Sequence, residues 1–393
     1  MSETMRLAYF SRFLPTADKG GGCRRTSQIM EVCHGNPPAF FAAAARDGLS
    51  TEQQERIADP ATAEERSARW LEPVSWSAAR EPAVVRLRCI AAEWAASLPI
   101  APPWDLVLIE DPVYFYPLLD ALAEGTIPVV ALCQNLETLS LNNIRREQQT
   151  TMLKRELDIL ARCAAVVTIS REEDLLLRNL GMKTYYLPYY PVPSLEARFR
   201  AVRLARSTTK KSGYLIMGSS GNIETKIGMA AVARHWSEEI APRTGEPLFV
   251  CGYLANRHLA DLAGLAGVEY LGELGNAPFD QLLSEVRAVI CYQEAGAGSL
   301  TRIPESLLAG LPVLANPIAA RSHQGMEGVV EFASLAGAKK RGQVHFFQRG
   351  GIDQASHSIP FVSHQARART FCKRFHNEAS SASSQIVCRV CSR

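Results

Sequence analysis

The sequence predicts an α/β fold built from two Rossmann-like domains in tandem. Short apolar runs alternate with amphipathic stretches from residue 5 to about residue 335, and a second series of runs begins after a proline-rich segment. This alternation is typical of parallel sheets covered by helices. The chain of 393 residues also exceeds the roughly 250–300 residues at which single cores stop growing, which favours two domains.

Each expected strand is a short apolar run, and each expected helix fills a longer gap between runs. The expected strands are residues 6–10, 105–110, 127–132, 164–169, 184–187, 213–217, 247–251, 268–271, 288–292 and 312–315. The expected helices are residues 84–97, 144–163, 172–180, 225–239 and 302–309. Ligands bind at the carboxyl ends of parallel strands, so we expect the loops of the two domains to face one another across a cleft.

Three prolines among residues 188–193, followed by a basic stretch, are typical of an interdomain linker. We therefore expect an N-terminal domain at residues 1–190, a linker at 191–212 and a C-terminal domain at 213–336. Residues 337–393 form a separate tail.

Composition excludes several classes of protein. The balance of 43 Lys+Arg against 40 Asp+Glu gives a net charge of +3, too small to indicate nucleic-acid binding through a global field. The sequence shows neither a secretory signal pattern nor about 18 consecutive apolar residues. Seven of the ten cysteines are scattered singly in residues 1–336, which suits reduced thiols better than a disulfide framework. We expect a cytoplasmic protein.

The tail differs abruptly from the rest of the chain. Residues 337–393 contain no leucine and hold ten Lys/Arg against two acidic residues. Because such a segment buries little apolar surface, its composition predicts disorder. Three other interpretations stay open: peripheral contact with anionic membrane lipids, a zinc site and a reading frame lost near Ala336. The zinc site would use Cys372, His376, Cys388 and Cys391.

Three glycines follow the first expected strand, in the segment from Pro15 to Arg25. Gly20, Gly21 and Gly22 let the backbone approach a ligand and expose N–H groups where the next helix starts. This is typical of a phosphate or sugar cradle, with Arg24 facing an anion. A flexible surface turn with solvated arginines explains the same residues.

A second candidate site follows the first strand of the C-terminal domain, at Gly218-Ser219-Ser220-Gly221-Asn222. Small residues and unpaired amides at a helix start can hold a diphosphate, and Lys226 adds positive charge. The alternative is that serine and asparagine only cap the helix.

The third candidate segment runs from Cys291 to Asn316 and holds a strand, a glycine loop, a short helix and another strand. Glu305 lies near the positive end of the expected helix, where its carboxylate can accept hydrogen bonds from ribose hydroxyls. Arg302 is placed to face a phosphate. The alternative is a glutamate that complements the helix dipole and an arginine in solvent.

These segments in this order resemble the two-domain GT-B glycosyltransferases, most nearly group 1 (family 4), over residues 5–335. The resemblance rests on the segment Gly296–Val313, which matches the family pattern Gly-x-Gly…Arg/Lys-Ile-x-Glu-(Ser/Ala)-Leu-x-Ala-Gly-x-Pro-Val. The glycine turn at Gly218 and the strand-glycine pairs ending at Gly252 and Gly272 add to it.

By this resemblance, Glu305 matches the glutamate that holds the ribose of a nucleotide-diphosphate sugar, and Glu294 stands for the glutamate that faces the donor sugar. Ten residues separate the two glutamates here, which is longer than the family's spacing, so Gly296 and Gly298 are candidates for backbone contacts instead. Lys226 and Arg302 are the nearest candidates for the diphosphate-binding cations.

The resemblance implies transfer of a sugar from a nucleotide-diphosphate sugar to a glycan or small-molecule acceptor, with retention of configuration. Amides and cations can stabilise the leaving group, so we expect neither a metal nor a cofactor. The sequence does not identify a catalytic base or nucleophile.

Acceptor contacts are expected from the loops after the strands of the first domain, at residues 20–25, 110–114 and 134–137, and the candidate residues are Gly21, Gly22, Arg24, Asn135 and Glu137. By analogy, the pathway would be polysaccharide biosynthesis. Two rival interpretations are a nucleotide-sugar epimerase and a degenerate, non-catalytic GT-B protein that binds a nucleotide sugar or a partner.

Overall fold

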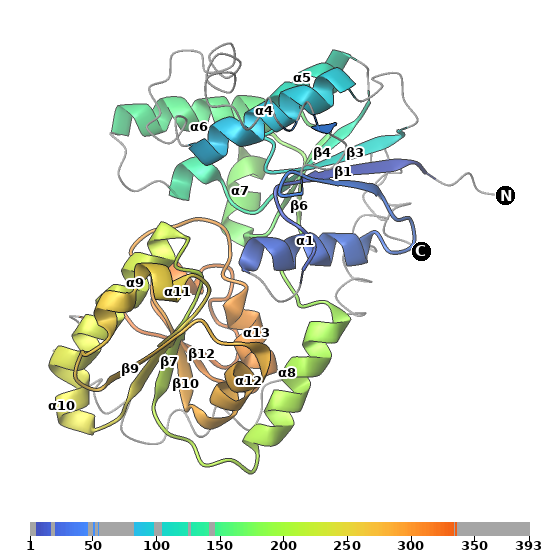
Figure 1. The fold of residues 1–393 in the computed structure, drawn as a ribbon. Helices are drawn as coiled ribbons and strands as arrows, with labels where there is room; N and C mark the ends of the chain where they lie inside the picture. The colour runs from blue at the N-terminus through green and yellow to red at the C-terminus, as the bar shows by residue number, and fades with distance from the viewer. Residues whose placement is uncertain are drawn as a thin grey trace. The chain divides into compact units, whose positions relative to one another are not determined.

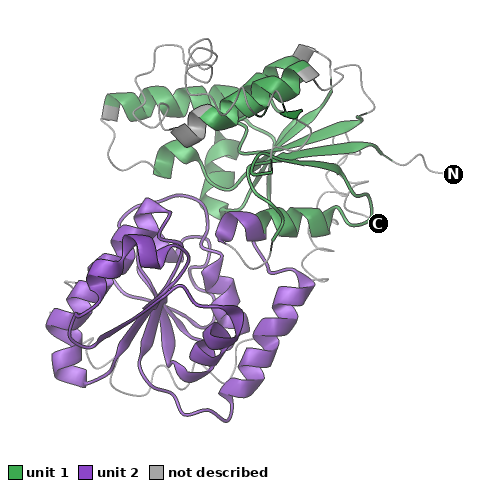
Figure 2. Cartoon of the chain, viewed as in Figure 1, with its two compact units in different colours: residues 1–16, 25–188, 365–393 green, residues 17–24, 189–364 purple. Residues whose placement is uncertain are grey.

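The computed structural model describes residues 5–16, 20–45, 50, 51, 54, 82–97, 104–124, 127–140, 146–333 and 335. These residues form two compact units (Figure 2). Unit 1 contains residues 5–16 and 25–188, and unit 2 contains residues 20–24 and 189–335. The expectations for the tail, namely disorder, lipid contact, the zinc site and the lost reading frame, concern residues outside the described part of the chain.

Unit 1 is built on a six-stranded parallel sheet with the order β2-β1-β3-β4-β5-β6 (Figure 1). Its strands are β1 (Leu7–Ser11), β2 (Ala39–Ala42), β3 (Leu106–Glu110), β4 (Val129–Cys133), β5 (Ala165–Thr168) and β6 (Thr184–Tyr186). The chain moves from β1 to β2 on one side and from β3 to β6 on the other. The order therefore reverses between β1 and β3, and such a switch point is where open parallel sheets bind ligands.

The helices of unit 1 bury their apolar faces against this sheet. They are α1 (Gly21–Val32), α4 (Pro82–Ser97), α5 (Tyr116–Glu124), α6 (Arg146–Ala161) and α7 (Arg171–Asn179), with a 3₁₀ turn at Glu137–Ser140. Trp94 of α4 is completely buried against Phe10 of β1, with ring centroids 5.2 Å apart. Near-continuous burial along β1, β3 and β4 is what a sheet covered on both faces requires.

Unit 2 repeats this plan with the order β12-β11-β10-β7-β8-β9, again entirely parallel. Its strands are β7 (Tyr214–Met217), β8 (Leu248–Cys251), β9 (Val268–Gly272), β10 (Ala288–Cys291), β11 (Val313–Ala315) and β12 (Val329–Glu331). Here the order reverses between β7 and β10, which places the loops after these two strands beside each other.

The helices of unit 2 include α8 (Pro193–Arg206), α9 (Ile223–His235), α10 (Ala241–Thr244), α11 (Ala255–His258), α12 (Asn276–Glu285), α13 (Arg302–Leu308) and α14 (Pro317–Ala320). A π-helical turn, Trp236–Ile240, joins α9 to α10. Two buried clusters cover the two faces of the sheet: one contains α8, α12 and α13, and the other contains α9 and Trp236.

The segment 191–212, which we interpreted as a linker, contains the packed helix α8. Pro193 is its first residue, where a missing N–H costs nothing, so the prolines that indicated a linker start a helix instead. Leu195, Phe199 and Val202 are buried in unit 2. The basic residue Arg206 is also buried and donates to the carbonyl oxygens of Gly310 and Val286 at 3.2 and 2.7 Å. The segment is therefore a structural part of unit 2.

All ten expected strands are present within two residues of their predicted ends, but the sequence analysis missed β2 and β12. Both are edge strands, of four and three residues, and neither is a fully buried apolar run. Among helices longer than four residues, the prediction also missed α5, α8 and α12, and it gave no bounds for the helix that it expected after the glycine segment, which is α1. Prolines lie in the first turn of α5, α8 and α12, and proline usually indicates a turn.

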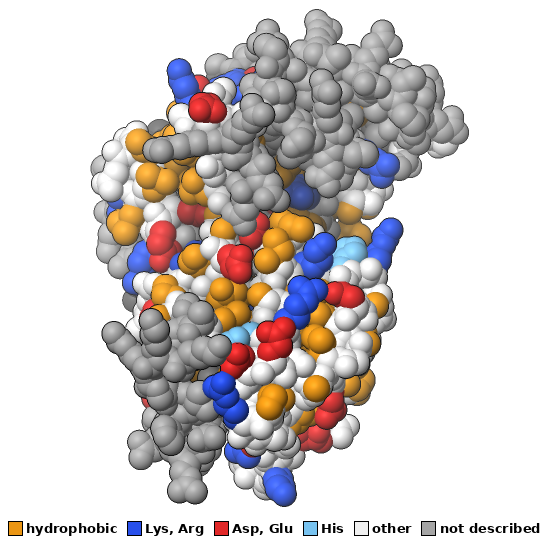
Figure 3. All heavy atoms as spheres, turned by 90° about the vertical axis from the view of Figure 1, so that its left-hand side faces the viewer, with side chains coloured by type: hydrophobic (Ala, Val, Ile, Leu, Met, Phe, Trp, Pro, Cys, Tyr) orange, Lys and Arg blue, Asp and Glu red, His pale blue; other side chains and the backbone are white. Residues whose placement is uncertain are grey.

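No helix in the described ranges is long and apolar enough to cross a bilayer. On the face drawn in Figure 3, acidic and basic side chains of the described residues are interspersed. This mixture agrees with the small net charge of +3.

Candidate functional site

The glycine-rich loops at the switch point of unit 2 form one candidate site. Residues 218–222 follow β7, and residues 292–301 follow β10 and lead into α13. Because β7 and β10 are hydrogen-bonded neighbours, both loops lie at the same carboxyl edge of the sheet. This edge brings together Gly218, Ser219, Glu294, Gly296, Gly298, Arg302 and Glu305, seven of the candidates from the sequence.

Glu305 is a buried carboxylate with two partners. It lies in α13 with only 2% of its surface exposed. The Tyr189 hydroxyl donates to Oε1 at 2.7 Å, and the Arg24 guanidinium forms an ion pair with Oε2. Burial raises the pKa of Glu305, and the charge of Arg24 opposes that rise. The sequence predicted Glu305 as a site residue but gave no sign of Tyr189, which is 116 residues away.

The glycine segment before Arg24 also contacts residues of unit 2. A Cβ at Gly21 would lie 3.2 Å from Thr301 Oγ1, and one at Gly20 would lie 3.8 Å from Ser219 Cβ. Arg24, which the sequence analysis assigned to the acceptor, therefore pairs with Glu305, which it assigned to the donor, and Gly21 lies beside Thr301. Gly22 continues α1 in the same segment.

Arg302 places a guanidinium against the loop after β7. A Cβ at Gly218 would lie 3.2 Å from Arg302 Nη1 and 2.4 Å from Thr225 Cγ2, so only glycine fits there. The Arg302 Nε is buried without a hydrogen-bond partner in the part of the chain that the structure describes. A buried donor without a partner costs about 1–3 kcal/mol. An anionic ligand at this loop would remove that cost.

Residues around the same loop also serve a structural purpose. The Asn222 side chain accepts a hydrogen bond from the Thr225 N–H at 2.9 Å and thereby caps α9, as the alternative interpretation expected. Ser220 N–H donates to the Tyr253 carbonyl at 3.0 Å. Lys226 lies in α9, four residues after the cap, and is partly exposed.

The loop after β10 is fixed by residues that the sequence analysis did not select. Arg321 donates to the Gly298 carbonyl at 2.7 Å, to the Ala297 carbonyl at 2.5 Å and to Gln293 Oε1 at 2.8 Å. Gly296 and Gly298 both have positive φ, +138° and +69°, a conformation that favours glycine. Arg321 follows the loop by more than twenty residues, so no local spacing could have identified it. Glu294 is exposed.

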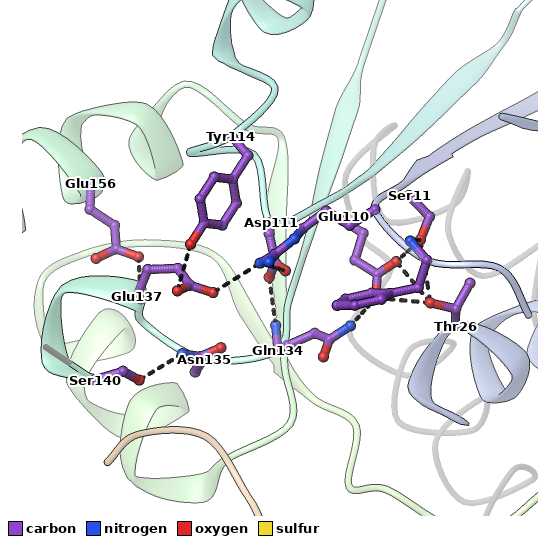
Figure 4. A network of polar contacts seen from close by, with 12 residues as sticks. Ser11, Thr26, Glu110, Asp111, Tyr114, Gln134, Asn135, Glu137, Ser140 and Glu156 are labelled. Carbon is purple, nitrogen blue, oxygen red and sulfur yellow. Dashed lines mark hydrogen bonds and ion pairs between the residues drawn. The ribbon is translucent and has the colours of Figure 1, made fainter. Parts of the chain in front are cut away.

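A second candidate site lies at the carboxyl edge of unit 1, at its own switch point (Figure 4). Glu110 ends β3 and is 1% exposed. It accepts hydrogen bonds from Tyr9 at 3.2 Å, from Thr26 at 2.9 Å and from Ser11 and Gln134 at shorter range. Burial raises its pKa. Because its donors come from β1, α1 and the loop after β4, Glu110 joins three segments of unit 1.

A second group of charges lies beside Glu110. The Arg12 guanidinium is within 3.5 Å of the carboxylates of Asp111 and Glu137 and lies 4.3 Å from the ring centroid of Tyr114. The Tyr114 hydroxyl donates to Glu137 at 2.7 Å. Asp111 has a left-handed φ of +49°, and burial, together with the charge of Glu137, raises its pKa well above its usual value. Positive φ outside glycine is typical of functional sites.

The candidates Asn135 and Glu137 both lie in the loop after β4. Asn135 donates to Ser140 Oγ at 2.7 Å. The backbone N–H of Glu137 and that of Thr138 donate to the Glu156 carboxylate at 2.8 and 3.0 Å. Burial raises the pKa of Glu156 to about 7. The sequence analysis selected Asn135 and Glu137, and its expected acceptor loop at residues 110–114 includes Asp111, but it missed Arg12 and Glu156, which come from other elements.

In the ranges given above for the structure, no cluster of three or more His, Cys, Asp and Glu side chains is arranged to hold a metal ion. The residues of the two candidate sites combine carboxylates, four arginines and glycine loops. These groups suit hydrogen bonding to hydroxyls and binding of phosphate oxygens.

No protein-family model and no curated protein matches the chain, but solved structures do. HepE of Anabaena, solved with UDP and glucose, is 13% identical and covers 96% of this chain and 100% of its own, with a TM-score of 0.55. Sucrose-phosphate synthase of Thermosynechococcus elongatus has the same identity and coverage with a TM-score of 0.58. A UDP-forming trehalose-phosphate synthase of Burkholderia xenovorans, solved with glucose-6-phosphate, is 11% identical over 96% of this chain and 100% of its own, with a TM-score of 0.59. The chain has the GT-B fold, as the sequence resemblance predicted.

Proposed function

We propose that this protein is a glycosyltransferase that moves a sugar from a nucleotide-diphosphate sugar to a glycan or small-molecule acceptor. The observation that carries the proposal is the constellation at the switch point of unit 2. There the buried carboxylate of Glu305 and the guanidinium of Arg302 lie within one short helix, which follows a glycine loop. A carboxylate that accepts from hydroxyls beside a cation that faces phosphate matches the two chemistries of a nucleotide diphosphate.

The donor is assigned to unit 2. Glu305 would accept from the ribose hydroxyls, and the partnerless Nε of Arg302 and the amides of Ser219 and Gly221 would hold the diphosphate. Lys226 would add charge, and Glu294, Gly296 and Gly298 would face the transferred sugar. UDP-sugars are the first donors to test, because the similar HepE structure contains UDP and glucose.

The acceptor is assigned to the carboxyl edge of unit 1, where Asn135 and Glu137 are partly exposed. Gly21 and Arg24 have contacts in unit 2; the sequence-based assignment of Gly21, Gly22 and Arg24 to the acceptor is kept as part of the proposal. The leaving diphosphate would be stabilised by arginines and amides, without a metal or cofactor. Transfer with retention of configuration, in the cytoplasm, is part of the same proposal.

The first experiment is a thermal-shift panel of UDP-, GDP-, ADP- and dTDP-sugars. A ligand that binds only the folded protein raises its stability, by about 2.7 kcal/mol at one hundred times its Kd. We expect a shift with one nucleotide family, lost in Glu305→Gln and in Arg302→Gln. The matched control is Glu269→Gln, an exposed glutamate on β9 of the same unit, which should retain the shift. No shift for any nucleotide in folded wild-type protein would refute the proposal.

A second candidate function is a non-catalytic protein that binds a nucleotide sugar. It is favoured by the exposure of Glu294 and by the ion pair that occupies Glu305. Release of the nucleoside diphosphate separates the two functions. With the donor found in the panel and a set of glycan acceptors, a transferase releases the diphosphate in proportion to product. A binding protein shows the thermal shift without release.

A further inference from the structure

Two arginines of unit 1 that the proposed glycosyl transfer does not use lie around one tyrosine ring. The guanidinium carbon of Arg88 in α4 lies 5.6 Å from the ring centroid of Tyr116, and that of Arg155 in α6 lies 5.8 Å from the same centroid. Tyr116 is the first residue of α5. The helices α4, α5 and α6 contribute to one buried cluster and cover the same face of the sheet (Figure 1). We call Arg88 and Arg155 the arginine pair.

Arg88 is a buried arginine whose charge has no acidic partner among the described residues. It is 8% exposed, and its Nε has no hydrogen-bond partner in the described ranges. Burial lowers the pKa of Arg88, and the charge of Arg155 lowers it as well. A buried guanidinium with an unpaired donor is unfavourable, because it has lost hydration without gaining an acceptor. A bound anion would supply both the acceptor and the opposite charge.

The acidic side chains of unit 1 do not balance the arginine pair. In the part of the chain that the structure describes, no carboxylate forms an ion pair with Arg88 or with Arg155. Glu156, next to Arg155, instead accepts from two backbone N–H groups of the 3₁₀ turn after β4, at 2.8 and 3.0 Å. The pair therefore presents two positive charges around one ring. Arg155 is partly exposed, so an anion can reach the pair from solvent.

The arginine pair lies beside the edge of unit 1 to which the acceptor is assigned. Tyr116 opens α5 shortly after the end of β3, so it lies near the carboxyl edge of the sheet. Two residues earlier, the Tyr114 hydroxyl donates to the acceptor candidate Glu137 at 2.7 Å. Glu156, adjacent to Arg155, binds the backbone N–H of the same Glu137. An anion bound by the pair would therefore lie next to residues assigned to the acceptor.

We propose that Arg88 and Arg155 form a binding site for a phosphate group. Guanidinium groups bind phosphate oxygens through charge-assisted, often bidentate hydrogen bonds. Two positive charges suit a phosphate monoester, which carries about −1.5 to −2 at pH 7, better than a carboxylate with a single charge. The phosphate can come from two sources. One is a phosphorylated acceptor, which rests on the proposed function, and the other is the free ion.

The test is calorimetric titration of the full chain with inorganic phosphate, with a panel of sugar phosphates and with the matching unphosphorylated sugars. We expect the phosphorylated compounds to bind more tightly than the sugars. Arg88→Met, which keeps an apolar side chain of similar length, and Arg155→Gln should each weaken phosphate binding at least about tenfold, because each removes charge-assisted hydrogen bonds. Tighter binding of one sugar phosphate than of inorganic phosphate identifies a phosphorylated sugar as the ligand, and equal binding identifies the free ion.

Arg86→Gln and Lys154→Gln are the matched controls, because each removes an exposed positive charge from the same two helices, α4 and α6. Both should bind phosphate as the wild type does. Arg302→Gln should lose the nucleotide shift but keep phosphate binding, so failure of the proposed donor site and failure of this inference give different results.

Three results overturn the proposal: no phosphate binding by the wild type, undiminished binding by Arg88→Met and Arg155→Gln, or a loss confined to Arg302→Gln. Arg155→Gln changes a partly exposed side chain and should fold, so it decides the test even if Arg88→Met does not fold.

Discussion

At the residue scale, buried carboxylates dominate both switch points. Glu110, Asp111 and Glu156 in unit 1 and Glu305 in unit 2 are each at most 3% exposed, and burial raises the pKa of each of them. Buried ionisable groups cost stability unless hydrogen bonds compensate. Each of these side chains accepts at least one hydrogen bond from another segment. They hold distant parts of the chain together at the edges where ligands bind.

Glu110→Ala should destabilise unit 1 by about 3 kcal/mol, because four side-chain donors lose their acceptor in a buried place. Urea unfolding followed by fluorescence measures the change. Glu269→Ala, at an exposed position, should change stability by less than about 0.5 kcal/mol. A loss for Glu110→Ala no larger than this would show that the network does not stabilise the unit.

The raised pKa of Glu156 predicts how the stability of the protein depends on pH. Its pKa is about 7 in the folded protein against a usual value of 4.5, so the folded state binds more protons between these values. Its contribution to stability is therefore greatest below the unfolded pKa and is lost as the pH rises through the folded pKa. Between pH 5 and pH 8, wild type should lose about 2 kcal/mol more than Glu156→Gln. Urea unfolding of the wild type and of Glu156→Gln at both pH values tests this. An equal loss of stability in the two proteins would contradict it.

At the element scale, the loops after the strands of unit 2 depend on close backbone contact. Gly252 directly follows β8 with a φ of +152°, and a Cβ there would lie 1.9 Å from the Gly218 carbonyl oxygen. The loop after β7 and the loop after β8 can therefore touch only through glycine. This contact fixes the position of residues 218–222 beside Arg302.

Gly252→Ala should destabilise the protein by about 3 kcal/mol and weaken nucleotide binding, since the added methyl group must push the two loops apart. Gly264→Ala is the matched control. Its φ is +96°, but a Cβ there meets nothing within 4 Å, so it should cost only the backbone strain, about 1 kcal/mol. Thermal unfolding of both variants, with and without nucleotide, measures the difference. An equal loss of stability in Gly252→Ala and Gly264→Ala would show that the two loops move apart easily.

Arg321 is the corresponding support for the loop after β10. Its guanidinium donates to residues 293, 297 and 298. Arg321→Ala should lower nucleotide-sugar affinity about tenfold, because the loop loses hydrogen bonds to a charged donor worth about 1.5–3 kcal/mol each. Arg321→Lys should retain only part of the lost affinity, because an ammonium group does not reproduce the planar, forked donors of a guanidinium. Calorimetric titration gives the affinities, and unchanged binding in Arg321→Ala would exclude this role.

At the scale of the whole molecule, the described core divides into clusters that stay within one unit. One cluster of unit 1 contains β1, β3, α4 and α5, and two clusters of unit 2 contain β7, β10 and the helices around them. Domains with separate cores can unfold separately.

Scanning calorimetry should therefore resolve two transitions, and a bound nucleotide should raise the temperature of only one of them. Trp94→Phe, in the core of unit 1, should lower the temperature of one transition and thereby identify it as the unfolding of that unit. Glu305→Gln should abolish the nucleotide effect without moving the transition that Trp94→Phe lowers. A nucleotide-dependent rise in the transition of unit 1 alone would contradict the assignment of the donor to unit 2.

Much of the fold could be predicted from the sequence because parallel strands that are buried on both faces consist of continuous runs of apolar residues. β3 and β4, fully buried along their length, were found for this reason. β2 and β12 were missed because edge strands bury little, and α8 was missed because its opening prolines indicate a linker as readily as a helix start. In the candidate site, Glu305 and Arg302 were found because they share one local motif with the glycine loop.

The sequence by itself determined the α/β class, the two-part plan and the glycine loops, since these follow from hydrophobic period and from residue types over short spans. Only the tertiary structure decided that Tyr189 and Arg24 hold Glu305, that Arg321 holds the loop after β10, and that Arg12 lies between Asp111 and Glu137. Such partners come from different strands and helices. Their meeting depends on strand order and on packing, and no local pattern in the chain encodes it.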